Sequence, residues 1–260
     1  MEYARTGQPQ LISSLAIAGA TSPVTLAGTL ALQNAEILAG IVLTQLVREG
    51  TPVVFAGSSS NAEMRTGGLS IGSPEMAINT AATAQMARYY NLPSRGGGAV
   101  SDAKAPDAQA GYKSMMSLLM AQVSGINFVL HTAGIFESYN CMSYEKFIID
   151  DEICGMVKKI KKGYKVNEDT LGFDVIKETG PRGHFLDKIH TLEHFRSEFY
   201  MTSLSDRDNF DNWEAKGSTQ CMQSANKRFK EILSAYEVPG LPADADRELK
   251  QFKGVGLPWN

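Results

Sequence analysis

The sequence predicts an α/β protein that contains a partial (β/α)8 barrel of about four βα units, followed by a mainly helical C-terminal extension. Short apolar segments alternate with long helical segments over the first two thirds of the chain, which is typical of a parallel sheet. Prolines open three of the helical segments at broadly similar intervals, at Pro23, Pro74 and Pro106. This regularity favours a barrel over a doubly wound sheet.

The first unit begins with an apolar segment, 11–18, that is compatible with a strand. The helix that follows is expected to end near Arg48, with Thr21 or Ser22 as its cap and a proline in its first turn. This helix contains the longest apolar stretch, 26–47. Polar residues and a glycine interrupt that stretch, so we expect a buried amphipathic helix and no membrane span.

The second unit has a buried strand at 53–56 and a long polar loop at 57–72. Its helix opens at 73–76 and runs to about Tyr90. The third strand is weak, because it lies near 94–100 and contains three consecutive glycines.

The third helix is expected at 106–123, and the fourth strand at 127–131. A loop at 132–140 and a helix at about 143–162 complete the fourth unit. A full barrel needs about 200–250 residues or more, so four units do not close one. The chain is therefore a fragment, or it forms a smaller open sheet, or two copies assemble.

The pattern changes near residue 166, so we divide the chain into 1–165 and 166–260. The second part is expected to hold the last barrel element or elements and the helical extension. Its segments are an incomplete further unit at 169–177 with 171–175 as its core, a helix at 184–200, a turn-rich patch at 210–213, a helix at 218–236 and a surface tail at 239–260.

Composition excludes several classes of protein. The net charge of −3 makes the chain a poor partner for nucleic acid or an anionic membrane. Its three cysteines, Cys141, Cys154 and Cys221, form no CxxC pair, which argues against a disulfide framework and favours a reduced, cytoplasmic setting. The start of the chain shows no signal peptide.

Ligands of parallel α/β proteins bind at the carboxyl ends of the strands. Here those ends are rich in small residues, which would leave a wide mouth for a large planar partner. The alternative is that small residues only permit tight turns. The loop residues expected to face such a partner are Thr21, Ser22, Gly57, Ser58, Gly97 and Gly98.

Several polar residues follow the third and fourth strands. Asp102 and Lys104 would form a charge pair at the mouth, or Asp102 would cap a helix and Lys104 would be solvated. His131 ends a strand where barrel enzymes keep functional groups, although a hydrogen-bonded core histidine has the same pattern. Glu137 and Tyr139 follow on the same loop. Aromatic residues near the mouth suit a quaternary ammonium group or belong to the core, namely Phe55, Phe136, Tyr139 and Phe185.

Three histidines are close together in the extension, at His184, His190 and His194. His190 and His194 are four residues apart and lie on one helical face. They lack the HExxH order of a zinc protease, so packing and hydrogen bonding are favoured and no metal site is expected.

Five stretches of the chain resemble the trimethylamine:corrinoid methyltransferase family. They are GATSPVT at 19–25, PSRGGG at 93–98, SDAK at 101–104 with PDAQAGY at 106–112, GHFL at 183–186 and HTLEHF at 190–195. The resemblance extends over nearly the whole chain, but family members are about twice as long. It implies that this chain is the C-terminal half of a barrel.

The resemblance implies methyl transfer from a methylated amine to the cobalt of a separate corrinoid protein. The trimethylamine branch carries pyrrolysine, whereas only standard residues occur here, so a quaternary amine such as glycine betaine is favoured over trimethylamine. The corrinoid is then a partner's group, and no tightly bound cofactor is expected. We also expect a homo-oligomer, because unpaired strand edges associate.

On this interpretation His131, Glu137 and Asp102 are the expected catalytic residues. Either Glu137 or Asp102 would balance the ammonium charge, and either Lys104 or His184 would hold a carboxylate. The substrate-binding residues would be Lys104, Tyr139, Phe136, His184 and Phe185. Co(I) is itself a strong nucleophile, so the protein needs none of its own.

Two other functions compete with this one. A zinc-dependent corrinoid methyltransferase for methanol or thiols would bind its metal through His184, His190 or His194, with Cys221 or a carboxylate. A half barrel could also be an inactive remnant or one part of a split enzyme.

Overall fold

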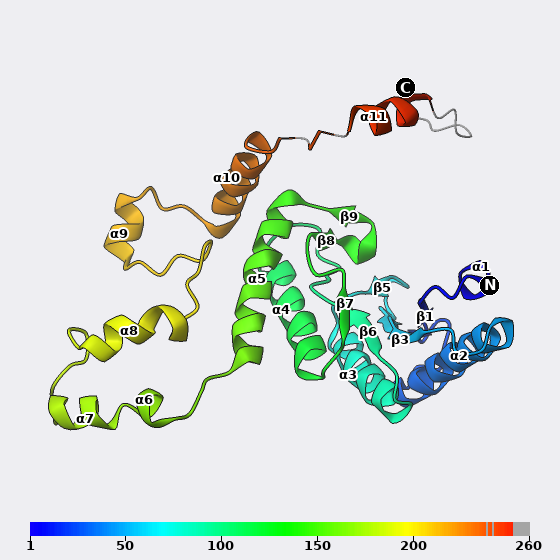
Figure 1. Ribbon diagram of the computed structural model, residues 1–260, viewed down its shortest axis with the longest axis horizontal. Helices are drawn as coiled ribbons and strands as arrows, with labels where there is room; N and C mark the ends of the chain where they lie inside the picture. Colours follow the sequence, from blue (N-terminus) through cyan, green and yellow to red (C-terminus); the bar gives the residue numbers. More distant parts are fainter. Residues whose placement is uncertain (238, 241, 252–260) are drawn as a thin grey trace.

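The computed structural model describes residues 1–237, 239–240 and 242–251. A four-stranded parallel sheet forms its centre, in the order β1-β3-β6-β7 (Figure 1). The strands are β1 (Gln10–Ser14), β3 (Val53–Gly57), β6 (Ser94–Gly97) and β7 (Phe128–Leu130). The predicted α/β class with a parallel sheet is confirmed. Within this sheet β3 pairs with β1, β6 with β3, and β7 with β6.

A long helix follows each strand of this sheet. The helices are α2 (Leu26–Val47), α3 (Pro74–Tyr89), α4 (Ala108–Val123) and α5 (Tyr144–Lys162). In α3, α4 and α5 a polar side chain caps the first turn, because Ser73, Asp107 and Ser143 each accept a backbone N–H. The cap of α4 is therefore Asp107, and not Asp102.

The helices pack on one face of the sheet. Ile37 of α2, Phe55 of β3 and Ala87 of α3 form a buried cluster, against which Ile12 of β1 packs. Gly40 lets α2 approach β1 closely, because a Cβ atom there would lie 2.6 Å from the Ile12 side chain. Alternation along a strand sends the neighbours of Ile12 and Phe55 to the other face.

The predicted start of α2 is wrong. The helix begins at Leu26, with Thr25 at the cap position and no side-chain cap. Thr21 Oγ1 accepts the backbone N–H of Ile17 instead, and the hydroxyls of Ser22 and Thr29 share a hydrogen bond of 2.9 Å. These bonds form a turn that delays the helix.

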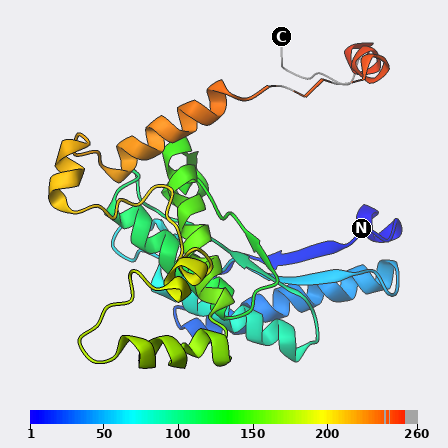
Figure 2. The same ribbon diagram turned by 60° about the vertical axis from the view of Figure 1, so that its left-hand side comes forward.

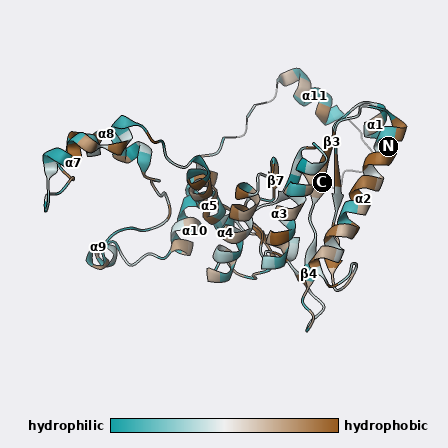
Figure 3. Cartoon of the chain, turned by 90° about the horizontal axis from the view of Figure 1, so that it is seen from below, coloured by the Kyte–Doolittle hydropathy of each residue, from teal (hydrophilic) through white to brown (hydrophobic). Residues whose placement is uncertain are grey.

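The expected buried, amphipathic character of α2 is also wrong. Its packed face carries polar residues, and the Gln33 amide donates to the Thr83 hydroxyl at 2.9 Å. Its other face exposes Val42, Leu43 and Leu46 (Figure 3). By length and composition α2 is apolar enough to cross a membrane, but its contacts with β1, β3 and α3 make it a helix that covers the sheet.

The loops between strands and helices contain further strands. The expected polar loop at 57–72 holds β4 (Ser60–Ala62), which pairs with β2 (Ile17–Ala18), and β5 (Leu69–Ser70), which is antiparallel to β4. The loop after β7 holds the antiparallel pair β8 (Ile135–Phe136) and β9 (Cys141–Met142), joined by the turn η1 (Glu137–Tyr139).

The described part of the extension is helical. The segment 171–175, expected to form the core of a further βα unit, lies within helices, and the patch at 210–213 is a helix instead of a turn. The chain also has a short first helix, α1 (Glu2–Arg5). The helices of the extension are α6 (Glu168–Leu171), α7 (Phe173–Thr179), α8 (Ile189–Glu198), α9 (Phe210–Ala215), α10 (Cys221–Ser234) and α11 (Ala243–Gln251).

The extension is anchored on α5 at two places (Figures 1 and 2). Helix α10 packs along α5, where Tyr144 stacks on Phe229 at 5.2 Å between ring centroids. Glu152, buried on α5, accepts backbone N–H bonds from Ser203 and Ser205. Burial would raise the pKa of Glu152, but these hydrogen bonds hold it below its ordinary value.

Candidate active site

A cleft of about 380 Å³ opens on the face of the sheet that the helices leave free. It lies at the carboxyl ends of the parallel strands, where α/β proteins bind ligands. Its walls combine leucines with a small group of polar side chains. The lining residues are Leu11, Ser13, Leu15, Ser58, Arg95, Leu130, His131 and Tyr139.

Arg95 is the centre of this cleft. It projects from the middle of β6 and is only 5% exposed. Its guanidinium donates to the Ser58 hydroxyl and lies 3.4 Å from Nδ1 of His131. Among the described residues Arg95 has no carboxylate partner, and its Nε atom has no hydrogen-bond acceptor.

This arrangement is electrostatically incomplete. Burying a cation costs free energy unless an anion compensates it. Burial lowers the pKa of Arg95, but a guanidinium stays protonated in proteins. The cleft therefore offers a desolvated positive charge with free donors, which is a site for a carboxylate or another small anion.

His131 and Tyr139 lie side by side beyond Arg95, with ring centroids 5.1 Å apart. Burial, and then the Arg95 charge, lower the pKa of His131, so its imidazole is neutral at pH 7. Burial raises the pKa of Tyr139, which keeps the phenol protonated. Neither side chain carries a charge that would compete with Arg95 for an anion.

The loop that carries these residues is conformationally strained. His131, Glu137, Ser138 and Tyr139 all have positive φ, at 57°, 45°, 52° and 77°. Such backbone is uncommon outside glycine, and it persists where surrounding contacts hold it. Backbone N–H groups of Glu137 and Ser138 donate to the carbonyls of Ala103 and Ser101, which fixes the loop against the one after β6.

A buried ion pair supports the same loop from behind. Lys146 and Asp150 of α5 meet at 2.5 Å, and both side chains are 1% exposed. Asp150 accepts the backbone N–H of Gly134 at 2.7 Å, and Lys146 donates to the Ala99 carbonyl at 3.2 Å. The pair thus ties α5 to the loops after β6 and β7.

The structure brings together some of the predicted site residues. His131, Tyr139 and Ser58 line the cleft. Gly97 borders it, since a Cβ atom there would lie 4.0 Å from the Tyr139 hydroxyl. Glu137 is half-buried on the same loop, and its side chain forms no hydrogen bond among the described residues.

Other predicted residues lie apart from the cleft. Asp102 pairs with Lys113 at 2.6 Å, whereas the exposed Lys104 donates to the Asp102 carbonyl. Phe136 is buried with Ala103 and Ala110.

His184 and Phe185 are exposed in the extension, where His184 lies 3.5 Å from Asp187. The aromatic Phe55 is fully buried in the core on the helix side.

Two of the glycines expected to widen the mouth serve packing instead. A Cβ atom at Gly57 would lie 2.3 Å from the Thr83 hydroxyl, and one at Gly98 would lie 2.8 Å from the Thr132 side chain. Thr21 and Ser22 form the turn before α2. At Gly57 and Gly98 the lack of a side chain therefore lets Thr83 and Thr132 pack closely against the backbone.

Sequence reasoning missed Arg95. The signal was present, because a lone arginine stands between serine and three glycines in a segment expected to be a strand. A charged residue inside a buried strand requires a partner or a ligand. The three glycines after Arg95 give no apolar alternation, so the sequence does not assign this side chain to a face of the strand.

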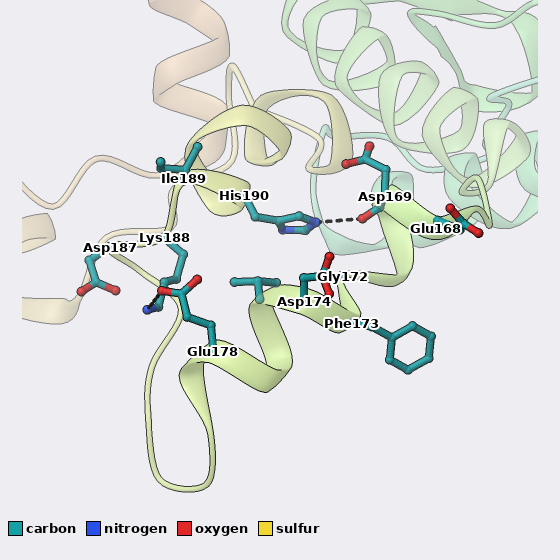
Figure 4. A pocket seen from close by; sticks show the side chains of 11 residues that line it. Glu168, Asp169, Gly172, Phe173, Asp174, Glu178, Asp187, Lys188, Ile189 and His190 are labelled. Carbon is teal, nitrogen blue, oxygen red and sulfur yellow. Dashed lines mark hydrogen bonds and ion pairs between the residues drawn. The ribbon is translucent and has the colours of Figure 1, made fainter.

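A second hollow, of about 410 Å³, lies on the extension between α6, α7 and the start of α8 (Figure 4). It is somewhat larger than the cleft, but exposed acidic side chains and Lys188 dominate its wall. The cleft is the better candidate for an active site, because it has a buried cation and lies at the carboxyl ends of the strands.

The profile of the trimethylamine methyltransferase family matches residues 1–254. The chain belongs to this family. It is 52% identical over 252 residues to glycine betaine methyltransferase of Desulfitobacterium hafniense strain Y51, covering 97% of this chain and 52% of that protein.

Two trimethylamine methyltransferases are less similar to the chain. The enzyme of Desulfitobacterium hafniense strain DSM 10664 / DCB-2 is 37% identical, with 93% of this chain and 48% of that protein covered. The enzyme of Methanosarcina barkeri strain Fusaro is also 37% identical, with 97% and 52% covered. The chain thus spans about half the length of these members of the trimethylamine methyltransferase family.

Proposed function

We propose that this chain is the C-terminal half of a (β/α)8-barrel enzyme that demethylates a quaternary amine bearing a carboxylate, such as glycine betaine. The methyl group goes to the Co(I) of a corrinoid carried by a partner protein. The observation that carries the proposal is the buried Arg95 in the cleft, which lacks an anionic partner among the described residues.

The sheet supports a half barrel. Its strands follow one another in chain order, and their helices lie on one face, as in a barrel and unlike a doubly wound sheet, where the strand order reverses. On the free face Leu11, Leu15 and Phe128 are 40–50% exposed. In a closed barrel this face would be the interior, covered by the strands of the other half.

The cleft offers different surroundings for the carboxylate and the ammonium group of a betaine. A carboxylate bound to Arg95 would accept charge-assisted hydrogen bonds from its guanidinium, which are about twice as strong as neutral ones. The methylated nitrogen would then lie toward Tyr139 and the leucines, where an aromatic face attracts quaternary ammonium and apolar walls suit methyl groups. Trimethylamine has no carboxylate and would leave Arg95 without a partner.

We therefore propose Arg95 as the residue that binds the substrate carboxylate, in place of Lys104 or His184. Lys104 and His184 lie outside the cleft lining, whereas Arg95 is its buried cation. Glu137, on the loop beside Tyr139, remains the proposed counter-charge for the ammonium. His131 would orient Arg95 through its Nδ1 acceptor and complete the wall.

The proposed reaction requires the protein to orient the substrate, and it requires no acid or base catalyst. In a quaternary ammonium the breaking C–N bond leaves its electron pair on nitrogen, so a neutral amine departs and no proton donor is needed. The corrinoid supplies the Co(I) electron pair that forms the new bond. The protein's task is to aim one methyl group out of the cleft and exclude competing poses.

The competing zinc-dependent reaction, with its metal bound through His184, His190 or His194, is less well supported, because these histidines lie in the extension and outside the cleft lining. His131 is the one histidine of the cleft lining, which contains no cysteine or carboxylate. Catalytic zinc sites use three protein ligands. We further propose a cytoplasmic enzyme that associates through its open face, with its other half or a second copy, and docks a corrinoid protein over the cleft.

The substitution Arg95→Gln tests the proposal. We expect binding of glycine betaine, measured by calorimetry, to weaken by about 10- to 100-fold, in line with the 1.5–3 kcal/mol of a hydrogen bond to a charged group. Methyl transfer to Co(I) cobalamin, followed by absorbance, should fall in parallel. The matched control is Arg88→Gln, because Arg88 is exposed and outside the cleft. Unchanged binding by the Arg95 variant would overturn the proposal.

A further inference from the structure

Helices α6 and α8 of the extension bring together three potential metal ligands. His190 and His194 lie one turn apart on α8, and Asp169 lies on α6. One ligand atom from each of the three lies within 4.8 Å of the others. Among the described residues this is the one group of three or more histidine, cysteine or acidic side chains so arranged. The sequence pairs the two histidines but does not indicate Asp169, which lies some twenty residues earlier.

The side chains already converge. Nε2 of His190 lies 3.1 Å from the Asp169 carbonyl (Figure 4). Nε2 of His194 lies 3.3 Å from a carboxylate oxygen of Asp169. The two imidazole rings are 4.4 Å apart. Tetrahedral zinc with bonds of about 2.0–2.1 Å separates its ligand atoms by about 3.4 Å. The cluster therefore needs only a small contraction to bind an ion.

The surroundings leave the ligands accessible. Asp169 lines two hollows of the extension, one beside His190 and the other beside His194. Among the described residues Asp169 forms no ion pair with lysine or arginine. No lysine or arginine in the described ranges therefore neutralises this carboxylate, and an ion can enter from solvent.

A metal ion would stabilise the helices of the extension, which have few other contacts with one another. Between residues 163 and 220 no described residue is buried, so α6, α7 and α8 lack an apolar core. Small units without a core are commonly held by a structural metal. An ion bound by α6 and α8 would fix the two helices to each other.

We propose that Asp169, His190 and His194 form a Zn²⁺ site that fastens α6 to α8. Two imidazoles and one carboxylate are a donor set typical of zinc, with water as the fourth ligand. His184 is outside the site, because it is exposed and lies beside Asp187. This site is separate from the cleft of Arg95, so it does not depend on the proposed methyl transfer.

The test uses the full chain without an affinity tag, treated with chelator and titrated with Zn²⁺ alone. We expect calorimetry to show that one equivalent of Zn²⁺ binds. Co²⁺ should give the visible absorption of a tetrahedral site. Mg²⁺ should bind the parent chain no more tightly than it binds the ligand variants. Zinc should also slow hydrogen exchange of the 167–198 backbone. The variants His190→Gln, His194→Gln and Asp169→Asn should each weaken binding by at least about 100-fold, more than changes outside the ligand shell do.

His184→Gln is the matched control, since it removes a neighbouring histidine and should leave zinc binding unchanged. Circular dichroism of the metal-free variants checks that each is folded as the parent is. Equal binding by the parent and the His190 and His194 variants would overturn the proposal. So would a loss of binding in the His184 variant as large as theirs, or zinc binding that leaves exchange of 167–198 unaltered.

Discussion

The α/β part of the chain, up to Lys162, and the extension that follows it are stabilised in different ways. The α/β part has several buried apolar clusters and a fully buried ion pair. In the described extension Ala225 is the one buried residue, and large apolar side chains such as Phe173, Leu186 and Leu192 are exposed. Burial of apolar surface is the main favourable term in folding, so the two parts should differ in stability.

This difference explains where each kind of chemistry is found. The α/β part holds strained backbone at Glu137, Ser138 and Tyr139. It also holds the buried Arg95, which has no carboxylate partner within the described part of the chain. The extension is held by surface hydrogen bonds, by the contact of α10 with α5 and, on our proposal, by a metal ion. Precise sites require supporting contacts, and those are abundant in only one of the two parts.

The largest contrast should come from charge pairs. We expect Lys146→Met to destabilise the α/β part by about 3–5 kcal/mol, because Asp150 is left as an uncompensated buried charge. Lys188→Met breaks the solvent-exposed pair with Glu178 and should leave the free energy of unfolding almost unchanged. Denaturant unfolding followed by circular dichroism measures both. Similar effects of the two substitutions would remove the distinction between the two parts.

Apolar truncation gives the next largest contrast. Leu118→Ala empties part of the cluster with Ile153 and Val157 and should cost about 2–5 kcal/mol. Leu192→Ala on α8 removes a 63% exposed side chain and should change the free energy of unfolding by no more than about 0.5 kcal/mol. A large effect at Leu192 would show that this surface of the extension is buried, against another copy or the other half of the protein.

Removing a helix-capping side chain should also have different effects in the α/β part and in the extension. Ser73 caps α3, and Ser73→Ala should lower the free energy of unfolding by about 1 kcal/mol. Asn209 caps α9 in the same way, but Asn209→Ala should speed hydrogen exchange only within 209–217 and leave the main unfolding transition in place. A shift of the main transition by Asn209→Ala would mean that the two parts unfold as one unit.

The smallest effect concerns pH. The pKa of His131 is lowered in the folded protein by burial and by Arg95. The unfolded chain therefore binds a proton more readily, and stability falls as the pH drops through about 6.5, the pKa of a free histidine. Asn tolerates the positive φ of this position, so His131→Asn should flatten the profile between pH 7 and 5. His184→Asn in the extension is the control, and an equal change in both profiles would contradict the assignment to His131.

Local sequence patterns determined most of the α/β architecture. The alternation of apolar segments and helices located all four strands of the parallel sheet and the helices after them, and Ser73, Asp107 and Ser143 marked three helix starts. Boundaries failed where side chains bond locally, as Thr21 and Ser22 do before α2. The helical nature of 171–175 was missed because short apolar runs have no decisive period.

The candidate site was only partly predictable. His131, Tyr139 and Ser58 follow strands, so their position at the carboxyl ends could be inferred from the strands alone. The burial of Arg95 depends on which face of β6 it occupies, and the fate of Phe136 depends on a cluster made by three separate segments. Such contacts join residues far apart in the chain, where local patterns carry no information.

By itself, the sequence determined the α/β class and the chain segments that end at the cleft, because apolar periodicity and turn residues act locally. Its motifs carried the resemblance to the family. Tertiary structure decided that Arg95 is the buried cation, that Lys146 and Asp150 support the loop above it, and that Asp169 meets His190 and His194. Each of these depends on distances between segments that only packing sets. Burial, and not residue type, decides whether a charge is solvated or is left in need of a partner.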